Sequence, residues 1–344
     1  MGNRYASAAY RELGEMLRQV RQRAGLTETE LARRLGWPLT TISRMEHGRR
    51  TSSTTDVIQY VAMCGLKVRE LEPYVEFTRI AERKQGYYLS DERIGGSLQS
   101  LIFHESSAVH SIIYEPLVIH GLLQTPGYTR ARILTLNPAG IAEETVAGAV
   151  RTRMERRQFL YLPNPARFTF YIPEQALRLR VGTDEIMQEQ LLHLVLTAGL
   201  ENVTVRIVPS ATGAVGAFRL MEFREHRPVV YLDALRFGGL ILDDPSYVNI
   251  YREQVAMLAE VALDEGQSRE CAADLADAYD RGSQRGVLEE EQLQPRVGHG
   301  LPGGGVAQEQ PEPRRGNRLR GGGVAEPPTP IYESRSAGPR FQEP

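Results

Sequence analysis

The amino-acid sequence predicts a mixed fold in three consecutive parts: an all-α domain of five helices, an α+β (or α/β) domain with a small sheet of about four strands, and a disordered C-terminal tail. Three observations predict it. Apolar residues recur at helical spacing from Leu13, the apolar period changes to two from Arg167, and glycine and proline become frequent from Gly282. We therefore divide the chain into a helical domain (1–83), a linker (84–97), an α+β domain (98–281) and a tail (282–344).

The first two helices follow from their apolar stripes and from the residues that end them. Gly25 ends the first helix, whose buried face is formed by Leu13, Met16, Leu17 and Val20. Thr27 precedes the second helix, and Glu30, three residues later, completes the pattern of a capping box. Gly36 is able to adopt the left-handed conformation required at the end of that helix. Pro38 cannot continue the second helix but can open a third.

The third helix, which Gly48 closes, is predicted to place Ile42 and Met45 inward. Five residues near its start point outward: Leu39, Thr40, Thr41, Ser43 and Arg44. A helix, a short turn with glycine and a second helix with polar outward residues form the geometry that enters the major groove of DNA. A plain three-helix core with a solvated face would also explain the periodicity. It does not, however, require the spacing of Ala32, Gly36 and Ile42.

The charge of this segment favours a nucleic-acid partner. Residues 9–50 contain nine Arg, no Lys and five Glu, a balance of +4, whereas the whole chain carries −2, so the remainder carries −6. Phosphates favour such a local positive excess even when the whole protein is not basic. We predict that four residues contact base edges of double-stranded DNA, with Arg44 forking onto a guanine: Leu39, Thr40, Thr41 and Arg44. The predicted phosphate contacts are Thr27, Ser43, Arg49 and Arg50.

This segment resembles the helix-turn-helix family of the Cro and xenobiotic-response-element (XRE) regulators. The matching residues are Leu13, Leu17, Arg21, Leu31, Ala32, Leu35, Gly36, Thr41, Ile42, Ser43, Glu46 and Gly48. The family often has a Gln early in the second helix, where it contacts phosphate, whereas this chain has Glu28 and Thr29. Because Glu28 would repel phosphate, we expect the Thr27 hydroxyl and main-chain amides to make that contact.

Two further helices complete the helical domain. The fourth is predicted around Val57 and Val61 and ends at Gly65, and the fifth runs to about Arg83 with Pro73 in its first turn, where proline is tolerated. Residues 84–96, which contain three glycines and a polar SDER segment, are predicted to form a connector.

The second domain combines helices with period-two segments. Helices are predicted at 98–110, 128–134, 143–160, 184–198, 247–263 and 268–279, and strands at 167–172, 203–209, 218–223 and 229–234, the last two as a hairpin. The 143–160 helix is rich in arginine, and a solvated face, salt bridges or a partner would each explain these residues: Arg151, Arg153, Arg156 and Arg157.

The tail is predicted not to fold. Its 63 residues include 12 Gly and 9 Pro, so it cannot bury enough apolar surface to offset its ordering entropy. It contains two copies of an 18-residue repeat, which are too few and too polar for a solenoid.

The second domain also resembles a known family. The segments 120–133, 151–158, 203–209 and 251–270 are similar to the uncharacterised C-terminal domain that follows a Cro-like helix-turn-helix in many actinobacterial regulators. The family usually has a proline before the glycine of the first segment, where this chain has His120. Some members are called antitoxin-like because a small protein is encoded beside them. The resemblance therefore implies a DNA-binding regulator with a possible small partner protein.

Residues that would mark an enzyme, a cofactor or a membrane protein are absent from the sequence. There is no GxSxG, no glycine loop followed by Lys, no HExxH and no paired Cys, so we expect no catalytic or metal site and no cofactor. Cys64 and Cys271 do not form a disulfide framework. No run of eighteen apolar residues and no signal peptide is found, which predicts a cytoplasmic, nucleoid-associated protein.

The sequence therefore predicts a sequence-specific transcriptional regulator that inserts its third helix into the major groove. Because one such unit contacts few base pairs, we expect a homodimer whose half-sites lie about 34 Å apart. The second domain would provide dimerisation and bind an effector or partner. The alternative is an antitoxin-like interaction module that binds a small neighbouring protein and uses DNA binding for autoregulation.

Overall fold

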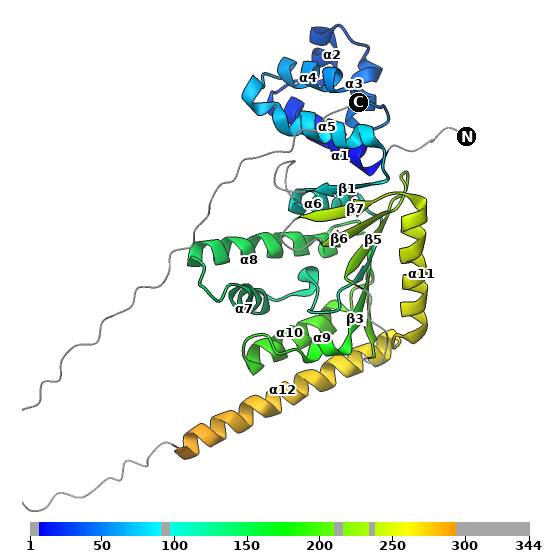
Figure 1. Cartoon of the computed structure of the whole chain (residues 1–344). Helices are drawn as coiled ribbons and strands as arrows, with labels where there is room; N and C mark the ends of the chain where they lie inside the picture. Colours follow the sequence, from blue (N-terminus) through cyan, green and yellow to red (C-terminus); the bar gives the residue numbers. More distant parts are fainter. Residues whose placement is uncertain (1–6, 91–96, 210–215, 234–237, 294–344) are drawn as a thin grey trace, which may run out of the picture. The chain divides into compact units, whose positions relative to one another are not determined.

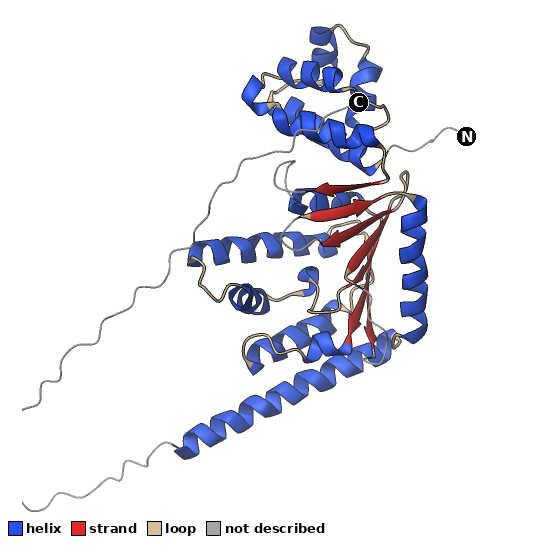
Figure 2. Cartoon of the chain, viewed as in Figure 1, coloured by secondary structure: helices blue, strands red, loops and turns tan. Residues whose placement is uncertain are grey.

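A computed structural model describes residues 7–90, 97–209, 216–233 and 238–293. The tail predicted from 282 lies outside the described residues from 294 onward, and so does the 91–96 part of the predicted linker. The chain begins with five α-helices, as predicted, and a short 3₁₀ helix (Figures 1 and 2): α1 Ala8–Arg23, α2 Glu28–Leu35, α3 Leu39–Glu46, α4 Thr54–Met63, η1 Val68–Glu70 and α5 Glu72–Arg83.

Local sequence signals set the ends of these helices. Thr27 caps α2 in a complete capping box with Glu30, and Gly36 ends α2 in the left-handed conformation with a φ of 68°. Gly48, which follows α3, also has a positive φ of 63°. Pro38 is the N-cap of α3, so the proline opens this helix from just outside it. These confirmed caps fix a three-helix arrangement in which the turn between α2 and α3 is tight.

The second domain is built on a mixed sheet that is larger than the predicted sheet of about four strands. It has seven strands in the order β1-β7-β6-β5-β2-β3-β4. The strands are β1 Tyr87–Ser90, β2 His110–Tyr114, β3 Arg167–Pro173, β4 Val203–Val208, β5 Phe218–Glu222, β6 Val229–Asp233 and β7 Gly239–Leu242. The four predicted strands correspond to β3, β4, β5 and β6, and β5 and β6 pair as the predicted antiparallel hairpin.

The three additional strands are short and pair with distant segments. The strand β1 lies in the predicted linker and pairs with β7, so its partner is about 150 residues away in the sequence. The strand β2 follows directly on a helical pattern, and its pairing with β5 and β3 is also long-range. A segment of four or five residues carries little periodicity of its own, so tertiary pairing determines these strands.

Helices cover both faces of the sheet. They are α6 Ser97–Ser107, α7 Pro126–Leu136, α8 Glu143–Arg157, α9 Glu174–Arg178, α10 Asp184–Thr197, α11 Pro245–Val261 and α12 Glu265–Leu293, with two 3₁₀ helices, η3 Gly121–Leu123 and η4 Gln158–Tyr161. Figure 1 shows α11 on one face and α6, α7, α8 and α10 on the other. The last helix, predicted to end at Tyr279, runs to Leu293 because the added segment is rich in Glu, Gln and Leu, which favour helices.

One face of the sheet carries α8 and α10. Sheet register places Ile113, Arg219 and Tyr231 side by side across β2, β5 and β6 on this face. Phe168 and Phe170 on β3 continue the same face and pack with Leu191 and Leu194 of α10 in one apolar cluster. The opposite face packs against α11 through Val248 and Leu258.

The helical domain and the sheet share a hydrophobic core. Leu13 and Leu17 of α1 belong to the same buried cluster as Tyr88, Phe223 and Ile241 of the second domain. Polar contacts join the same surfaces: the backbone N–H of Ala8 donates to Asp243 Oδ2 at 2.6 Å, and the Tyr88 hydroxyl donates to Glu12 Oε2 at 2.5 Å. The α1 helix is therefore part of both domains.

None of the described helices combines the length and the apolar composition that crossing a bilayer requires.

Candidate nucleic-acid interface

The outward side of α3 carries the residues predicted to contact bases. Leu39 is 47% exposed, and Thr40 and Arg44 are also exposed, whereas Thr41 is half-buried. Ile42 and Met45, predicted to point inward, are almost completely buried. The Arg44 guanidinium has no hydrogen-bond or ion-pair partner among the described residues. The helix thus presents Arg44 and Thr40 to solvent, while Ile42 and Met45 anchor its other side in the apolar core.

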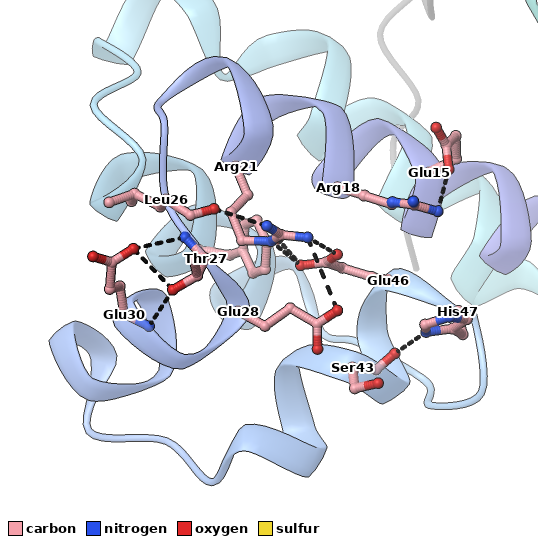
Figure 3. Close-up of polar contacts among 11 residues, drawn as sticks. Glu15, Arg18, Arg21, Leu26, Thr27, Glu28, Glu30, Ser43, Glu46 and His47 are labelled. Carbon is pink, nitrogen blue, oxygen red and sulfur yellow. Dashed lines mark hydrogen bonds and ion pairs between the residues drawn. The ribbon is translucent and has the colours of Figure 1, made fainter.

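A buried ion pair fixes the C-terminal end of α3 to α1. Arg21 Nε and Nη2 donate to the two Glu46 oxygens at 2.6 and 2.7 Å, and Arg21 Nη1 donates to the carbonyl of Leu26 at 2.8 Å (Figure 3). The Tyr60 hydroxyl of α4 also donates to Glu46, at 2.6 Å. Hydrogen bonding to Glu46 raises the pKa of Arg21, and burial followed by the hydrogen bond to Glu46 raises the pKa of Tyr60. This network holds α1, α3 and α4 in one arrangement.

Two glycines allow the backbones of α1 and α3 to come close together. A Cβ at Gly14 would lie 2.4 Å from the backbone oxygen of Glu46, and one at Gly48 would lie 2.7 Å from the Arg11 backbone. Real Cβ atoms do not approach backbone atoms so closely, so both positions require glycine. The orientation of α3 therefore depends on direct backbone contact with α1.

Thr27 and Glu28 are both engaged within the domain. The Thr27 hydroxyl donates to Glu30 Oε2 at 2.8 Å and accepts from the Glu30 backbone N–H at 3.2 Å. A phosphate contact from this hydroxyl would have to replace the bond to Glu30. Glu28 points toward Arg21, with 3.9 Å between Glu28 Oε1 and Arg21 Nη2, as Figure 3 shows. The Glu28 carboxylate, in a part of α2 where the family often has Gln, therefore lies next to the Arg21 guanidinium.

The predicted phosphate contacts after α3 are exposed but paired. Arg49 Nη2 lies 3.1 Å from Glu225 Oε2 at the tip of the β5–β6 hairpin, and Arg50 Nη2 lies 3.6 Å from Asp56 Oδ2. Ser43 is half-buried, and its backbone oxygen contacts the His47 ring at 2.7 Å. Arg49, Arg50 and Glu225 line a cleft of about 500 Å³. The hairpin contact was not foreseen, because 176 positions separate its two residues.

His, Asp and Cys side chains, which catalysis and metal binding often use, are dispersed over the described residues. His104 and His120 are buried, and no group of three His, Cys, Asp or Glu able to hold a metal occurs within the described ranges. Asp244 caps α11, and Asp243 Oδ2 accepts a hydrogen bond from the backbone N–H of Ala8. Cys64 and Cys271 are free thiols.

Comparison with known proteins gives two matches. A family model described as a domain of unknown function (DUF5753) matches residues 98–273, and a model described as a helix-turn-helix domain matches residues 12–73. No curated protein matches the chain, and no solved structure does.

Proposed function

Because this chain belongs to the DUF5753 family and has a helix-turn-helix domain in front of the family's domain, we propose that it is a sequence-specific transcriptional regulator. In this proposal, α3 enters the major groove of double-stranded DNA. The second domain provides dimerisation and binds an effector. The helix-turn-helix match itself supports the coarser role of a DNA-binding regulator.

The observation on which this proposal depends is the outward side of α3. Leu39, Thr40 and Arg44 are exposed, while Ile42 behind them is completely buried. A recognition helix needs this combination, since its base-contacting side chains must be free while its backbone is held rigidly. Arg44 has the planar fork that pairs with the O6 and N7 atoms of guanine.

The direct test compares two arginines that have different proposed roles. A preferred site is first selected from random DNA with the purified protein. Replacement of Arg44 by alanine should then cost about 1–3 kcal/mol on that site and relax one base position. Replacement of Arg49 by alanine should weaken binding to all sequences alike and reduce the slope of log K against log salt by about one unit.

Mobility-shift titrations at several salt concentrations measure both effects. The matched control is Arg151→Ala, because Arg151 is an exposed arginine on α8, outside the helix-turn-helix domain. It should leave binding unchanged. An equal loss on every sequence for Arg44→Ala would make Arg44 a phosphate contact. No selectable site at all would reject the proposed function.

Dimerisation is assigned to the outer side of α11. Four apolar side chains on that side are exposed: Tyr247 39%, Ile250 51%, Met257 56% and Val261 43%. With Gln254 between them they follow alternating spacings of three and four residues, the seam of a two-helix coiled coil. A second copy of the chain presents the same seam, so a two-fold axis would bury both stripes and match a palindromic operator.

A charge placed in this seam tests the dimer. Met257→Glu should shift the protein from dimer to monomer in sedimentation velocity, because a carboxylate in a dry seam is costly. Glu253→Gln, an exposed change on the same helix, should leave the assembly unchanged. A wild-type protein that stays monomeric at micromolar concentration would contradict this assignment.

A further inference from the structure

Arginine side chains lie on the side of α8 that faces the sheet. We expected a solvated face or salt bridges for the four arginines of this helix; Arg151 is exposed, whereas Arg153 and Arg156 are largely covered. Arg219 of β5 comes from the sheet to the same place, above the ring of Tyr231 at 5.3 Å. Burial, followed by the charges of these three arginines, lowers the pKa of His120. Arg153 lies beside this histidine, since a Cβ on the next residue, Gly121, would be 3.5 Å from Arg153 Nε.

Among the described residues, one carboxylate pairs directly with these three cations. Glu105 of α6, whose side chain is 1% exposed, accepts from Arg156 Nη2 at 2.7 Å and from Arg219 Nη1 at 3.0 Å. Arg153 Nη1 donates instead to the uncharged amide oxygen of Gln124 at 2.9 Å. Burial, followed by repulsion from neighbouring arginines, lowers the pKa of Arg153. The cluster therefore has an uncompensated buried positive charge.

Other charged groups act on this region without removing the excess. Arg132 adds a further positive charge, since it acts on both Arg153 and Glu115. Burial raises the pKa of Glu115, whereas the interaction with Arg219 lowers it, so this carboxylate offsets one of the four positive charges. Asp233 is exposed, so water screens its charge.

The polar atoms left without a partner in this region are donors. His120 Nδ1 accepts from the backbone N–H of Leu122 at 3.3 Å, so the proton of the neutral ring is on Nε2. That Nε2 atom, Arg156 Nε and Ser111 Oγ are buried and have no hydrogen-bond partner among the described residues. Ser111 lies on the same sheet face as Arg219. It is two residues along β2 from Ile113, which is paired with Arg219. Buried donors normally have a partner, because an unpaired one costs roughly 1–3 kcal/mol.

We propose that Arg153, Arg156, Arg219 and His120 form a binding site for the anionic oxygen group, a carboxylate or a phosphate, of a small-molecule effector. Such a group supplies acceptors and negative charge together, and this cluster has fewer of both than its donors and positive charges require. Arginine forks recognise carboxylate and phosphate oxygens in pairs, which adds geometric selectivity. The inference rests on the effector role proposed for the second domain, but its test does not involve DNA.

The test measures thermal unfolding of the full chain with three sodium salts at equal ionic strength: phosphate, acetate and chloride. Phosphate or acetate should raise Tm above the chloride value, by about 2–4 °C once the anion reaches about five times its Kd. Arg153→Gln should remove this increase. The same variant should have an equal or higher Tm in chloride, because it removes an uncompensated buried charge.

Two variants serve as controls. Arg151→Gln changes the same charge on the exposed side of α8 and should respond to the anion as the wild type does. If Arg153→Gln does not fold, Arg153→Lys keeps the charge but not the fork, and calorimetry should show binding weakened about tenfold or more. The proposal is wrong if neither anion stabilises the protein more than chloride, or if the Arg153 variants bind as the wild type does. Because no step uses DNA, either result leaves the proposed DNA binding standing.

Discussion

Gly14 determines how closely α3 approaches α1. Its missing side chain lets the α1 backbone lie against the last turn of α3, where a Cβ would meet the Glu46 oxygen at 2.4 Å. Neither partner is the flexible end of a side chain, so the clash cannot be relieved locally. Any larger residue must displace one helix from the other and disturb the Arg21–Glu46 pair beside it.

We therefore expect Gly14→Ala to be destabilising despite the higher helix propensity of alanine. Overpacking of this kind costs about 1–3 kcal/mol, and the displaced α3 should also bind its DNA site more weakly. The control is Gly148→Ala on α8, where a Cβ has nothing within 4 Å and should be neutral or stabilising by up to about 1 kcal/mol. Urea unfolding measures both variants, and equal effects would contradict the close-contact argument.

Residues that act through their immediate neighbours were the ones the sequence could predict. The capping box of Thr27 and Glu30 and the left-handed Gly36 depend on a few adjacent positions, and the structure has both. The phosphate role of Thr27 and the base role of Arg44 stay predictions. The donors around His120 were not predicted, because they lie on β2, β5 and α8, which are far apart in the sequence.

At the scale of elements, the β5–β6 hairpin reaches from the second domain to Arg49, just after α3. Its tip residue Glu225 pairs with Arg49 at 3.1 Å, and both side chains are largely exposed. A carboxylate at this position competes with a DNA phosphate for the same guanidinium and also repels the phosphate. The hairpin is therefore expected to weaken DNA binding without affecting sequence preference.

Glu225→Gln should accordingly strengthen binding to all DNA sequences. An exposed ion pair contributes about 0.2–1 kcal/mol, so the gain should be about 1.5- to 5-fold and should shrink at high salt. Glu253→Gln makes the same change in net charge on α11 and should have a smaller effect. Fluorescence anisotropy with a specific and a random duplex measures this, and unchanged affinity for both would reject competition at Arg49.

Elements with strong periodicity were predicted and elements defined by pairing were not. The long helices and the strands β3 to β6 follow their apolar patterns. The strands β1 and β7 have only four residues each and pair with each other across the sequence, so no local signal marks them. The sequence left a solvated face, salt bridges or a partner open for the arginines of α8, since only the position of Glu105 on α6 shows which of them are covered.

At the scale of the whole molecule, buried histidines link stability to pH. Burial lowers the pKa of His104 and His120 below the ordinary value of 6.5. The unfolded chain therefore binds protons at pH values where the folded chain does not. Their contribution to stability is present above about pH 6.5 and is lost as the pH falls below it.

The free energy of unfolding should thus decrease between about pH 7.5 and 5.5, by up to about 1.4 kcal/mol per pH unit for each buried histidine. His104→Gln removes one titrating group and should flatten this slope. His47→Gln replaces an exposed histidine and should leave the slope as it is. Denaturant titrations at several pH values provide the comparison, and identical slopes for wild type and His104→Gln would refute the assignment.

The α1 helix, which packs on α3 through Gly14 and on the sheet through Ala8 and Glu12, makes the N-terminal part inseparable from the rest. A fragment cut after Arg83 would leave one flank of α1 uncovered, with the Glu12 carboxylate deprived of the Tyr88 hydroxyl and Arg11 deprived of the Phe223 ring. Grafting this domain onto a foreign protein would therefore leave the side chains of Arg11 and Glu12 on α1 without the contacts that they have here. Exchange of this N-terminal domain between proteins should require that the new sheet have a tyrosine and a phenylalanine at the positions of Tyr88 and Phe223.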